Sequence, residues 1–304
     1  MVQQFNYPSC AGGMIHACRW LPEGQPKAVV QIIHGIAEYG ARYDHFARFL
    51  ASQGILVTVQ DHMGHGGSIC DETPRAVIQG GWFDMVEDTY QLFRDTHKEY
   101  PDVPYFFFGH SMGSFVLRTI LAKYPDSGIA GAVICGTGWM GKPIMVGGLA
   151  VASAVCKIKG AAHPSPLLKS VMFGGYNSRI ENARTENDWL STDPKVVDTY
   201  NADPNCGFMA SAGLVRAMLT GLLYIHKPEN LAAMDRSSLC ISSQAAKILW
   251  AITARAWSWL RLNLSRQAWS EWIAGSTPVV ATRSSTSAIK KRSIWTPTNG
   301  SSPF

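Results

Sequence analysis

The sequence predicts an α/β fold with a doubly wound, mostly parallel sheet and an inserted helical cap. Three observations lead to this prediction. Apolar runs of strand length alternate with amphipathic helical segments over the first 136 residues, a pattern typical of parallel sheets connected by helices. A glycine-flanked serine joins one such run to the next helical segment. A mostly apolar stretch then interrupts the alternation, and 304 residues suffice for one large domain with an insertion.

Each predicted element has a short apolar run, which indicates a strand, or apolar residues at helical spacing, which indicate a helix. The predicted strands cover residues 28–33, 55–60, 105–108 and 128–136. The predicted helices between them cover residues 42–53, 84–100 and 114–124. Gly54 and Pro101 directly follow two of these helices, where glycine and proline commonly end a helix.

From about Trp139 to His226 the alternation gives way to two mostly apolar helices, predicted over 144–158 and 214–225, with polar loops between them. Both are shorter than the roughly 18 to 20 residues of a membrane span, so we expect buried or interfacial helices. We therefore predict three parts: residues 1–138 as the N-terminal part of the core, 139–226 as the cap, and 227–304 as a C-terminal segment. An apolar cap suits a lipid-like substrate, although helices that merely pack on the core would have the same composition.

The segment GHSMG at 109–113 fits the pattern G-x-S-x-G. It directly follows a predicted strand and precedes a predicted helix, which is the strand–turn–helix setting of a nucleophilic serine. The flanking glycines avoid the clashes that a Cβ atom would cause in so tight a turn. We therefore predict Ser111 as the nucleophile. The backbone N–H of Met112, at the helix N-terminus, is predicted to donate to a developing oxyanion.

The second oxyanion donor of such sites comes from the loop after an early strand. His34, Gly35 and Ile36 follow the predicted strand 28–33 directly. The backbone N–H of Ile36 is therefore the predicted partner of Met112 in the oxyanion hole.

Three segments of the sequence together carry a family pattern. In chain order they are residues 34–68, GHSMGS at 109–114, and WLSTDPKVVDTYNADPNCGF at 189–208. Together they resemble the monoacylglycerol lipase, lysophospholipase and serine aminopeptidase branch of the α/β-hydrolases, over about residues 8 to 236. The resemblance implies an α/β-hydrolase fold, the same roles for Ser111, Ile36 and Met112, and lipid-type carboxylic esters as substrates. A further turn resembles the family's D-x-x-G-x-G segment, which we interpret as structural; it contains Asp61, His62, Gly64, His65 and Gly66.

The resemblance fails where the rest of the catalytic triad should follow. A serine hydroxyl needs a base to take its proton, and in this fold the chain order is serine, then acid, then histidine. No histidine follows His226, and Asp235 and Glu271 are the only acids in the last 70 residues. His163 and His226 fall in the predicted cap, where we interpret them as ordinary polar residues rather than a substitute base. The sequence thus predicts that the triad acid and base are missing and that the chain as written is inactive.

The C-terminal segment has the composition of a chain read in the wrong frame. Residues 235–304 hold six of the ten tryptophans but two of the 28 glycines. If the last nucleotide of each codon is read with the first two of the next, Leu239–Ala251 can encode V-Y-F-I-S-G-G-K-D-P-V-G. In the same frame Ser276–Ser287 can encode Y-P-G-G-R-H-E-V-L-N-E. These match the family's acid and histidine segments, so we infer a frameshift near Ser237–Ser238 and a non-native C-terminal quarter that packs poorly.

Charge and cysteine use limit the partners that we expect. Residues 235–304 carry nine Lys/Arg and two acids, a net charge of +7, whereas residues 1–234 carry 18 Lys/Arg and 20 acids, a net charge of −2. A basic segment produced by a frameshift was never selected for binding, so we expect no nucleic-acid partner and at most peripheral membrane contact through the cap. Seven scattered cysteines without a CxxC pair, and a start without a leader pattern, predict a cytoplasmic protein.

The sequence therefore predicts a carboxylic ester hydrolase that acts through an acyl-enzyme on Ser111, without a metal or an organic cofactor. Two alternatives stay open. One is a non-catalytic remnant whose cap still binds an acyl chain, and the other is a peptidase or aminopeptidase of the same family.

Overall fold

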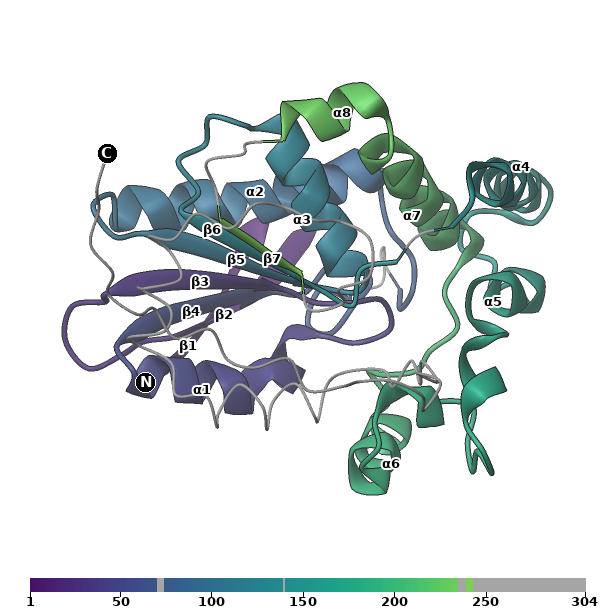
Figure 1. Ribbon diagram of the computed structural model, residues 1–304, viewed down its shortest axis with the longest axis horizontal. Coiled ribbons are helices and arrows are strands. Elements are labelled where there is room, and N and C mark those ends of the chain that lie inside the picture. Colours follow the sequence, from purple (N-terminus) through teal and green to yellow (C-terminus); the bar gives the residue numbers. More distant parts are fainter. Residues whose placement is uncertain (70–73, 139, 235–238, 243–304) are drawn as a thin grey trace, which may run out of the picture.

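The computed structural model describes residues 1–69, 74–138, 140–234 and 239–242 (Figure 1). Trp139, at the predicted cap boundary, lies outside these residues. The positions at which the shifted frame encodes the acid and the histidine, and the poor packing predicted for the C-terminal quarter, also lie outside them.

One sheet forms the centre of the described structure (Figure 1). Its strands are β1 (Val2–Pro8), β2 (Met14–Trp20), β3 (Ala28–Ile33), β4 (Ile55–Gln60), β5 (Tyr105–His110), β6 (Gly131–Cys135) and β7 (Leu239–Ser242). Among the described residues they make a seven-stranded sheet in the order β1-β2-β4-β3-β5-β6-β7. The β1–β2 and β2–β4 pairs are antiparallel and the remaining pairs are parallel. The predicted α/β class with a mostly parallel sheet is confirmed.

The β1–β2 hairpin was not predicted from the sequence. Most β1 side chains are exposed or half-buried, so this strand lacks the apolar run that identified the others. Gly12 and Gly13 provide its turn, with φ values of 94° and 79° that side chains with a Cβ rarely adopt. The glycine pair was the available signal for a hairpin.

Helices cover both faces of the sheet, and several lie beyond one end of it (Figure 1). They are α1 (Asp44–Ser52), α2 (Trp82–Glu99), α3 (Met112–Lys123), α4 (Lys142–Lys159), α5 (Pro166–Phe173), α6 (Pro194–Ala202), α7 (Ala212–Ile225) and α8 (Pro228–Ala233). Short 3₁₀ turns occur at η1 (Gly40–Tyr43), η2 (Tyr176–Arg179) and η3 (Asp188–Leu190). Helix α1 packs on one face of the sheet, whereas α2 and α3 cover the other.

The pleat of the strands explains the two hydrophobic cores. Neighbouring residues of a strand point to opposite faces, so Ile32 packs with α1 while Ile33 packs with α2 and α3. In the same way, Phe107 of β5 packs in the core with α2 and α3, and Phe108 packs in the core with α1. Strands buried on both faces read as continuous apolar runs, and this is why the sequence located the central strands well.

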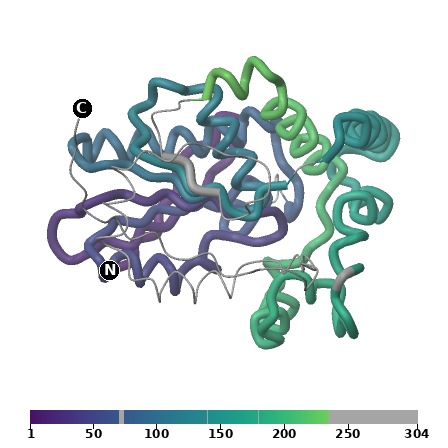
Figure 2. Tube along the Cα trace, viewed as in Figure 1, coloured from purple at the N-terminus to yellow at the C-terminus, as the bar shows by residue number. Residues whose placement is uncertain are grey.

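Between β6 and α7 the chain leaves the sheet, runs through α4, α5 and α6, and returns along α7 (Figure 2). Helix α7 packs against α3 and α4, and its Gly221 lies directly on the indole of Trp82 in α2. A Cβ atom at Gly221 would lie 2.0 Å from that ring, so glycine allows α7 to approach α2. The division of the chain into core and cap at 139 and 226 stays a prediction.

None of the helices within the described ranges has both the length and the apolarity that crossing a membrane requires.

Candidate active site

Ser111 lies at the sharp turn between strand β5 and helix α3, where its backbone adopts φ 51° and ψ −119°. A residue with a Cβ atom is strained in this conformation. The glycines on either side permit the turn. A Cβ atom at Gly109 would lie 2.6 Å from the carbonyl oxygen of Gly113, and one at Gly113 would lie 2.0 Å from that of Ile33. The G-x-S-x-G pattern is therefore required by close backbone contacts here.

Backbone hydrogen bonds hold this turn against the next strand. The N–H of Ser111 donates to the carbonyl of Cys135 at the end of β6, over 3.0 Å. The carbonyl of Ser111 accepts the N–H of Ser114 at 2.9 Å and its hydroxyl at 2.5 Å. Ser111 is half-buried and Met112, the first residue of α3, is fully buried. The Ser111 side chain therefore extends from a backbone that hydrogen bonds hold in place at a helix N-terminus.

The loop after β3 lies directly against Ser111. A Cβ atom at Gly35 would be 3.1 Å from the Cβ of Ser111, so the two residues are in contact. Ile36 follows Gly35 and packs its side chain on the main core, and Ala37 adopts a φ of 55°. The structure thus brings this loop, Ser111 and the first turn of α3 together. Which backbone N–H groups serve an oxyanion is taken up under Proposed function.

Glu38 organises this loop, a role that the sequence analysis did not assign. The carboxylate is buried, and its Oε1 accepts the N–H of Gly35 at 2.6 Å and Nδ1 of His110 at 3.1 Å. The Tyr43 hydroxyl also donates to Oε1 at 3.0 Å, and Arg42 pairs with Oε2. Burial opposes the charge, but the His110 hydrogen bond and the Arg42 guanidinium hold the pKa of Glu38 well below its usual range.

The same loop is held from the side of α6. The carbonyl of Ala37 accepts the N–H of Gly207 at 3.0 Å and the hydroxyl of Tyr200 at 2.9 Å. Tyr200 is on α6 and Gly207 follows that helix, so the excursion between β6 and α7 helps to set the loop conformation.

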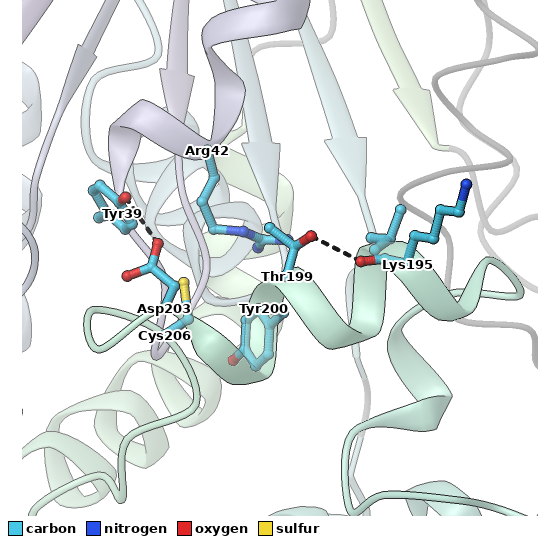
Figure 3. A pocket seen from close by; sticks show the side chains of 8 residues that line it. Tyr39, Arg42, Lys195, Thr199, Tyr200, Asp203 and Cys206 are labelled. Atoms are coloured by element: carbon cyan, nitrogen blue, oxygen red, sulfur yellow. Dashed lines mark hydrogen bonds between the residues drawn. The ribbon is translucent and has the colours of Figure 1, made fainter.

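A cavity of about 410 Å³ lies between this loop and α6 (Figure 3). Arg42 lies over the ring of Tyr200, 4.9 Å from its centroid, and the Tyr39 hydroxyl donates to Oδ2 of Asp203 at 2.9 Å. The described residues that line the cavity are Tyr39, Arg42, Lys195, Val196, Thr199, Tyr200, Asp203 and Cys206.

Asp61 supports the turn after β4, which we interpreted as structural. Its carboxylate accepts the N–H of Gly40 at 2.6 Å and that of Gly67 at 2.8 Å, and it pairs with Nδ1 of His16 at 3.0 Å. Gly66, at φ 48°, leaves room for it, since a Cβ there would lie 2.3 Å from Asp61 Oδ2. Similarly, a Cβ at Gly64 would lie 2.1 Å from the carbonyl oxygen of Val77. These contacts give each of these residues a packing role.

Three buried histidines join the loop after β3 to the turn after β4. Nδ1 of His34 donates to the carbonyl of Gly35 at 2.7 Å, and its Nε2 accepts the N–H of His62 at 3.0 Å. Nε2 of His62 donates to the carbonyl of His34 at 3.2 Å, and Nδ1 of His65 donates to that of Met63 at 3.1 Å. A ring nitrogen that accepts an N–H carries no proton, so His34 is neutral.

Burial lowers the pKa of all three histidines, that of His65 to about 3. The ring centroids of His34 and His62 are 4.2 Å apart, and those of His34 and His65 are 5.3 Å apart. Nδ1 of His62 and Nε2 of His65 have no hydrogen-bond partner within the described part of the chain. Protonation of any of these three histidines would therefore place a charge among buried, closely packed rings and disturb their packing.

The two histidines that follow Ser111 in the sequence bond elsewhere. Nδ1 of His226 donates to the carbonyl of Leu222 at 2.7 Å, and its Nε2 is 3.5 Å from the guanidinium of Arg118. His163 contributes its carbonyl to the N–H of Ala212 at the start of α7. In the described ranges neither ring hydrogen-bonds to Ser111, and no cluster of His, Cys, Asp and Glu could hold a metal ion.

Strand β7 ends beside the serine turn. Its Ser242 pairs with Ile134 of β6, and Cys135 of β6 is the residue that pairs with His110 of β5.

The chain is similar to several known proteins. Residues 24–248 match the family model described as serine aminopeptidase, S33. Monoglyceride lipase of Mus musculus is 33% identical over 195 residues, which are 64% of this chain and 57% of that protein. Monoacylglycerol lipase of Mycolicibacterium smegmatis is 29% identical over 235 residues, 76% of this chain and 74% of that protein. This chain thus spans little more than half the length of the mouse relative.

Among solved structures, a thermostable carboxyl esterase from Bacillus coagulans, in complex with glycerol, superposes with a TM-score of 0.71. It is 28% identical, over 79% of this chain and 78% of the esterase. The family match covers well over half of the chain. The chain therefore belongs to the serine aminopeptidase S33 family of α/β-hydrolases.

Proposed function

We propose that this scaffold hydrolyses carboxylic esters of lipid type, monoacylglycerols or lysophospholipids, through an acyl-enzyme on Ser111. The observation that carries the proposal is the strained serine turn between β5 and α3, with the loop at Gly35 in contact with the serine. The relatives named monoglyceride lipase and carboxyl esterase support the substrate class. The apolar residues of α4 and α7 suit an acyl chain.

In the proposed reaction the Ser111 hydroxyl oxygen attacks the ester carbonyl carbon and a base removes its proton. The N–H groups of Ile36 and Met112 donate to the resulting oxyanion. Removing one such donor from a working site costs about 10²–10³ in kcat. Glu38 helps to hold the donor loop, since it bonds Gly35 on one side and His110 on the other. Collapse of the tetrahedral intermediate releases the alcohol, and water then cleaves the acyl-enzyme.

We further propose that the chain as written hardly turns over, because no histidine follows His226 and the codons of the C-terminal segment permit the family's acid and histidine segments in the shifted frame. Loss of the base from a triad costs about 10⁶ in kcat.

A fluorophosphonate probe tests both proposals together. Three chains are compared: the chain as written, a chain in which the frame is restored after Arg236, and the restored chain with Ser111→Ala. We expect rapid labelling of the restored chain alone. Rapid labelling of the chain as written would contradict its inactivity, and labelling of the restored Ser111→Ala chain would contradict the choice of nucleophile.

The substrate class requires a second assay of the restored chain. Release of fatty acid from monoacylglycerol and lysophospholipid is measured beside release of an arylamine from aminoacyl arylamides. We expect hydrolysis of the esters. Faster cleavage of the arylamide would instead favour the aminopeptidase activity that the family description names. Binding of a fluorescent fatty acid by the chain as written, without labelling, would identify the acyl-binding remnant.

A further inference from the structure

The loop that carries Ile36 has a strained backbone directly after that residue. Ala37 adopts a φ of 55°, and a residue with a Cβ atom is strained in this left-handed region. Strained residues persist where the surrounding structure fixes them, and they gather at functional sites. The groups that fix Ala37 therefore matter for the conformation of the whole loop.

Helix α6 and the residues after it supply these groups. The Ala37 carbonyl accepts the Tyr200 hydroxyl at 2.9 Å and the N–H of Gly207 at 3.0 Å. Tyr200 is 7% exposed, so water has little access to compete for its hydroxyl. The Arg42 guanidinium lies 4.9 Å from the centroid of the Tyr200 ring and helps to place that ring (Figure 3). A buried side chain of α6 is thus bonded directly to the loop.

The Ile36 N–H lies between two points at which the loop is held. Before it, the Gly35 N–H donates to Oε1 of Glu38 at 2.6 Å. After it, the Ala37 carbonyl is held from α6. The direction of a peptide N–H follows from the backbone dihedral angles around it, and an oxyanion donor is effective only at about 2.7–3.1 Å from the oxyanion. Loss of either hold should therefore let the Ile36 N–H turn away from Ser111.

We propose that Tyr200 is a positioning residue for the oxyanion hole and that it makes the hole depend on the seating of α6. The inference rests on the proposed function, because it concerns the donor loop of the same site. The Tyr200 hydroxyl acts through the Ala37 carbonyl on the Ile36 N–H. A displacement of α6 would thus weaken the stabilisation of the oxyanion while every residue around Ser111 stays the same.

The first test compares two tyrosine-to-phenylalanine variants of the chain whose frame is restored after Arg236. Tyr200→Phe removes the hydroxyl and keeps the ring beside Arg42. Tyr7→Phe is the matched control, because Tyr7 is also 7% exposed and its hydroxyl also donates to a backbone carbonyl at 2.9 Å, that of Asp88 in α2. Each variant loses one buried hydrogen bond, so we expect similar decreases in melting temperature.

Ester hydrolysis by the two variants should differ. A hydrogen bond of this kind changes an equilibrium by about fivefold, so kcat should fall about fivefold in Tyr200→Phe. KM should stay unchanged, because the oxyanion forms only in the transition state. Tyr7→Phe should keep the kcat of the restored parent. Equal losses of kcat in the two variants would overturn the proposal, as would a rise in KM with kcat unchanged in Tyr200→Phe.

Amide hydrogen exchange in the chain as written tests the coupling without catalysis. The Gly207 N–H, which shares the Ala37 carbonyl with Tyr200, and the Gly35 N–H should exchange about fivefold faster in Tyr200→Phe. Both amides should exchange at the parent rate in Tyr7→Phe. Unchanged exchange of both amides in Tyr200→Phe would overturn the proposal. A restored parent without esterase activity would refute the proposed function alone, because the exchange rates still decide whether Tyr200 holds the loop.

Discussion

Acid should destabilise this protein through the buried histidines, and His65 offers the clearest test. Its ring is fully buried beside His34, and burial lowers its pKa to about 3, compared with about 6.5 in an unfolded chain. A group whose pKa is lower in the folded state binds its proton more readily when unfolded. The stabilisation from the neutral ring is therefore complete above about pH 6.5 and is lost progressively as the pH falls toward 3.

The size of the effect follows from these two pKa values. One pKa unit corresponds to about 1.36 kcal/mol. At pH 4.5 the unfolded-state imidazole is almost fully protonated while the folded-state imidazole is not. The pH is then about two units below the unfolded-state pKa. This makes the free energy of unfolding about 3 kcal/mol smaller than at pH 7.5, from this one residue. His34 and His62, with lowered pKa values, act in the same direction.

The assay is urea unfolding at pH 7.5 and pH 4.5 of the parent chain, His65→Asn and His45→Asn. Asparagine can keep a donor toward the Met63 carbonyl, which Nδ1 of His65 provides. We expect the loss of stability between the two pH values to be about 3 kcal/mol smaller in His65→Asn. His45 is exposed on α1, so His45→Asn should match the parent. Buried carboxylates such as Glu38 also lose stability in acid, but equally in all three proteins. An unchanged pH dependence in His65→Asn would refute the reasoning.

Two further predictions concern packing and the donor loop. Gly221→Ala places a Cβ against the Trp82 indole and should lower the free energy of unfolding by about 1–3 kcal/mol, measured by urea denaturation. Gly147→Ala in α4, where no atom lies within 4 Å of the added Cβ, should raise it by about 0.5–1 kcal/mol; equal effects of the two would contradict the contact. Glu38→Gln leaves the Gly35 N–H and its neighbours with a weaker acceptor and should cost about 1–3 kcal/mol, and an unaltered unfolding midpoint would count against the role of the carboxylate.

The sequence predicted the central strands, the helices between them and the serine turn, because each depends on a local pattern. Strand β5 and Gly109 show this, since a Cβ atom at Gly109 would meet the backbone of Gly113 and Ser114, within a few residues of Ser111. The helix predicted over 84–100 begins two residues earlier, at Trp82, because the Asp84 carboxylate caps it by accepting the N–H of Gly81 at 2.7 Å.

The supporting network of the site was beyond local reasoning. Glu38 reads as an ordinary surface acid four residues before Arg42, yet it contacts His110, which is 72 residues away in the chain. The support of the Ala37 carbonyl by Tyr200 joins residues 163 positions apart. Such pairs depend on sheet order, which a single sequence does not specify. The available signal was an acid inside a turn that otherwise carries apolar residues and glycines.

The left-handed backbone at position 111 has a consequence for the evolution of a chain that lacks a general base. Conformations of this kind cost on the order of 1–3 kcal/mol, and an enzyme retains them because they aim its reactive atom. A protein without a general base retains this conformational cost but gains no catalytic rate from it. Drift at this codon should then run toward glycine, the residue at home in that conformation, and a Ser111→Gly protein should melt at a higher temperature than its parent.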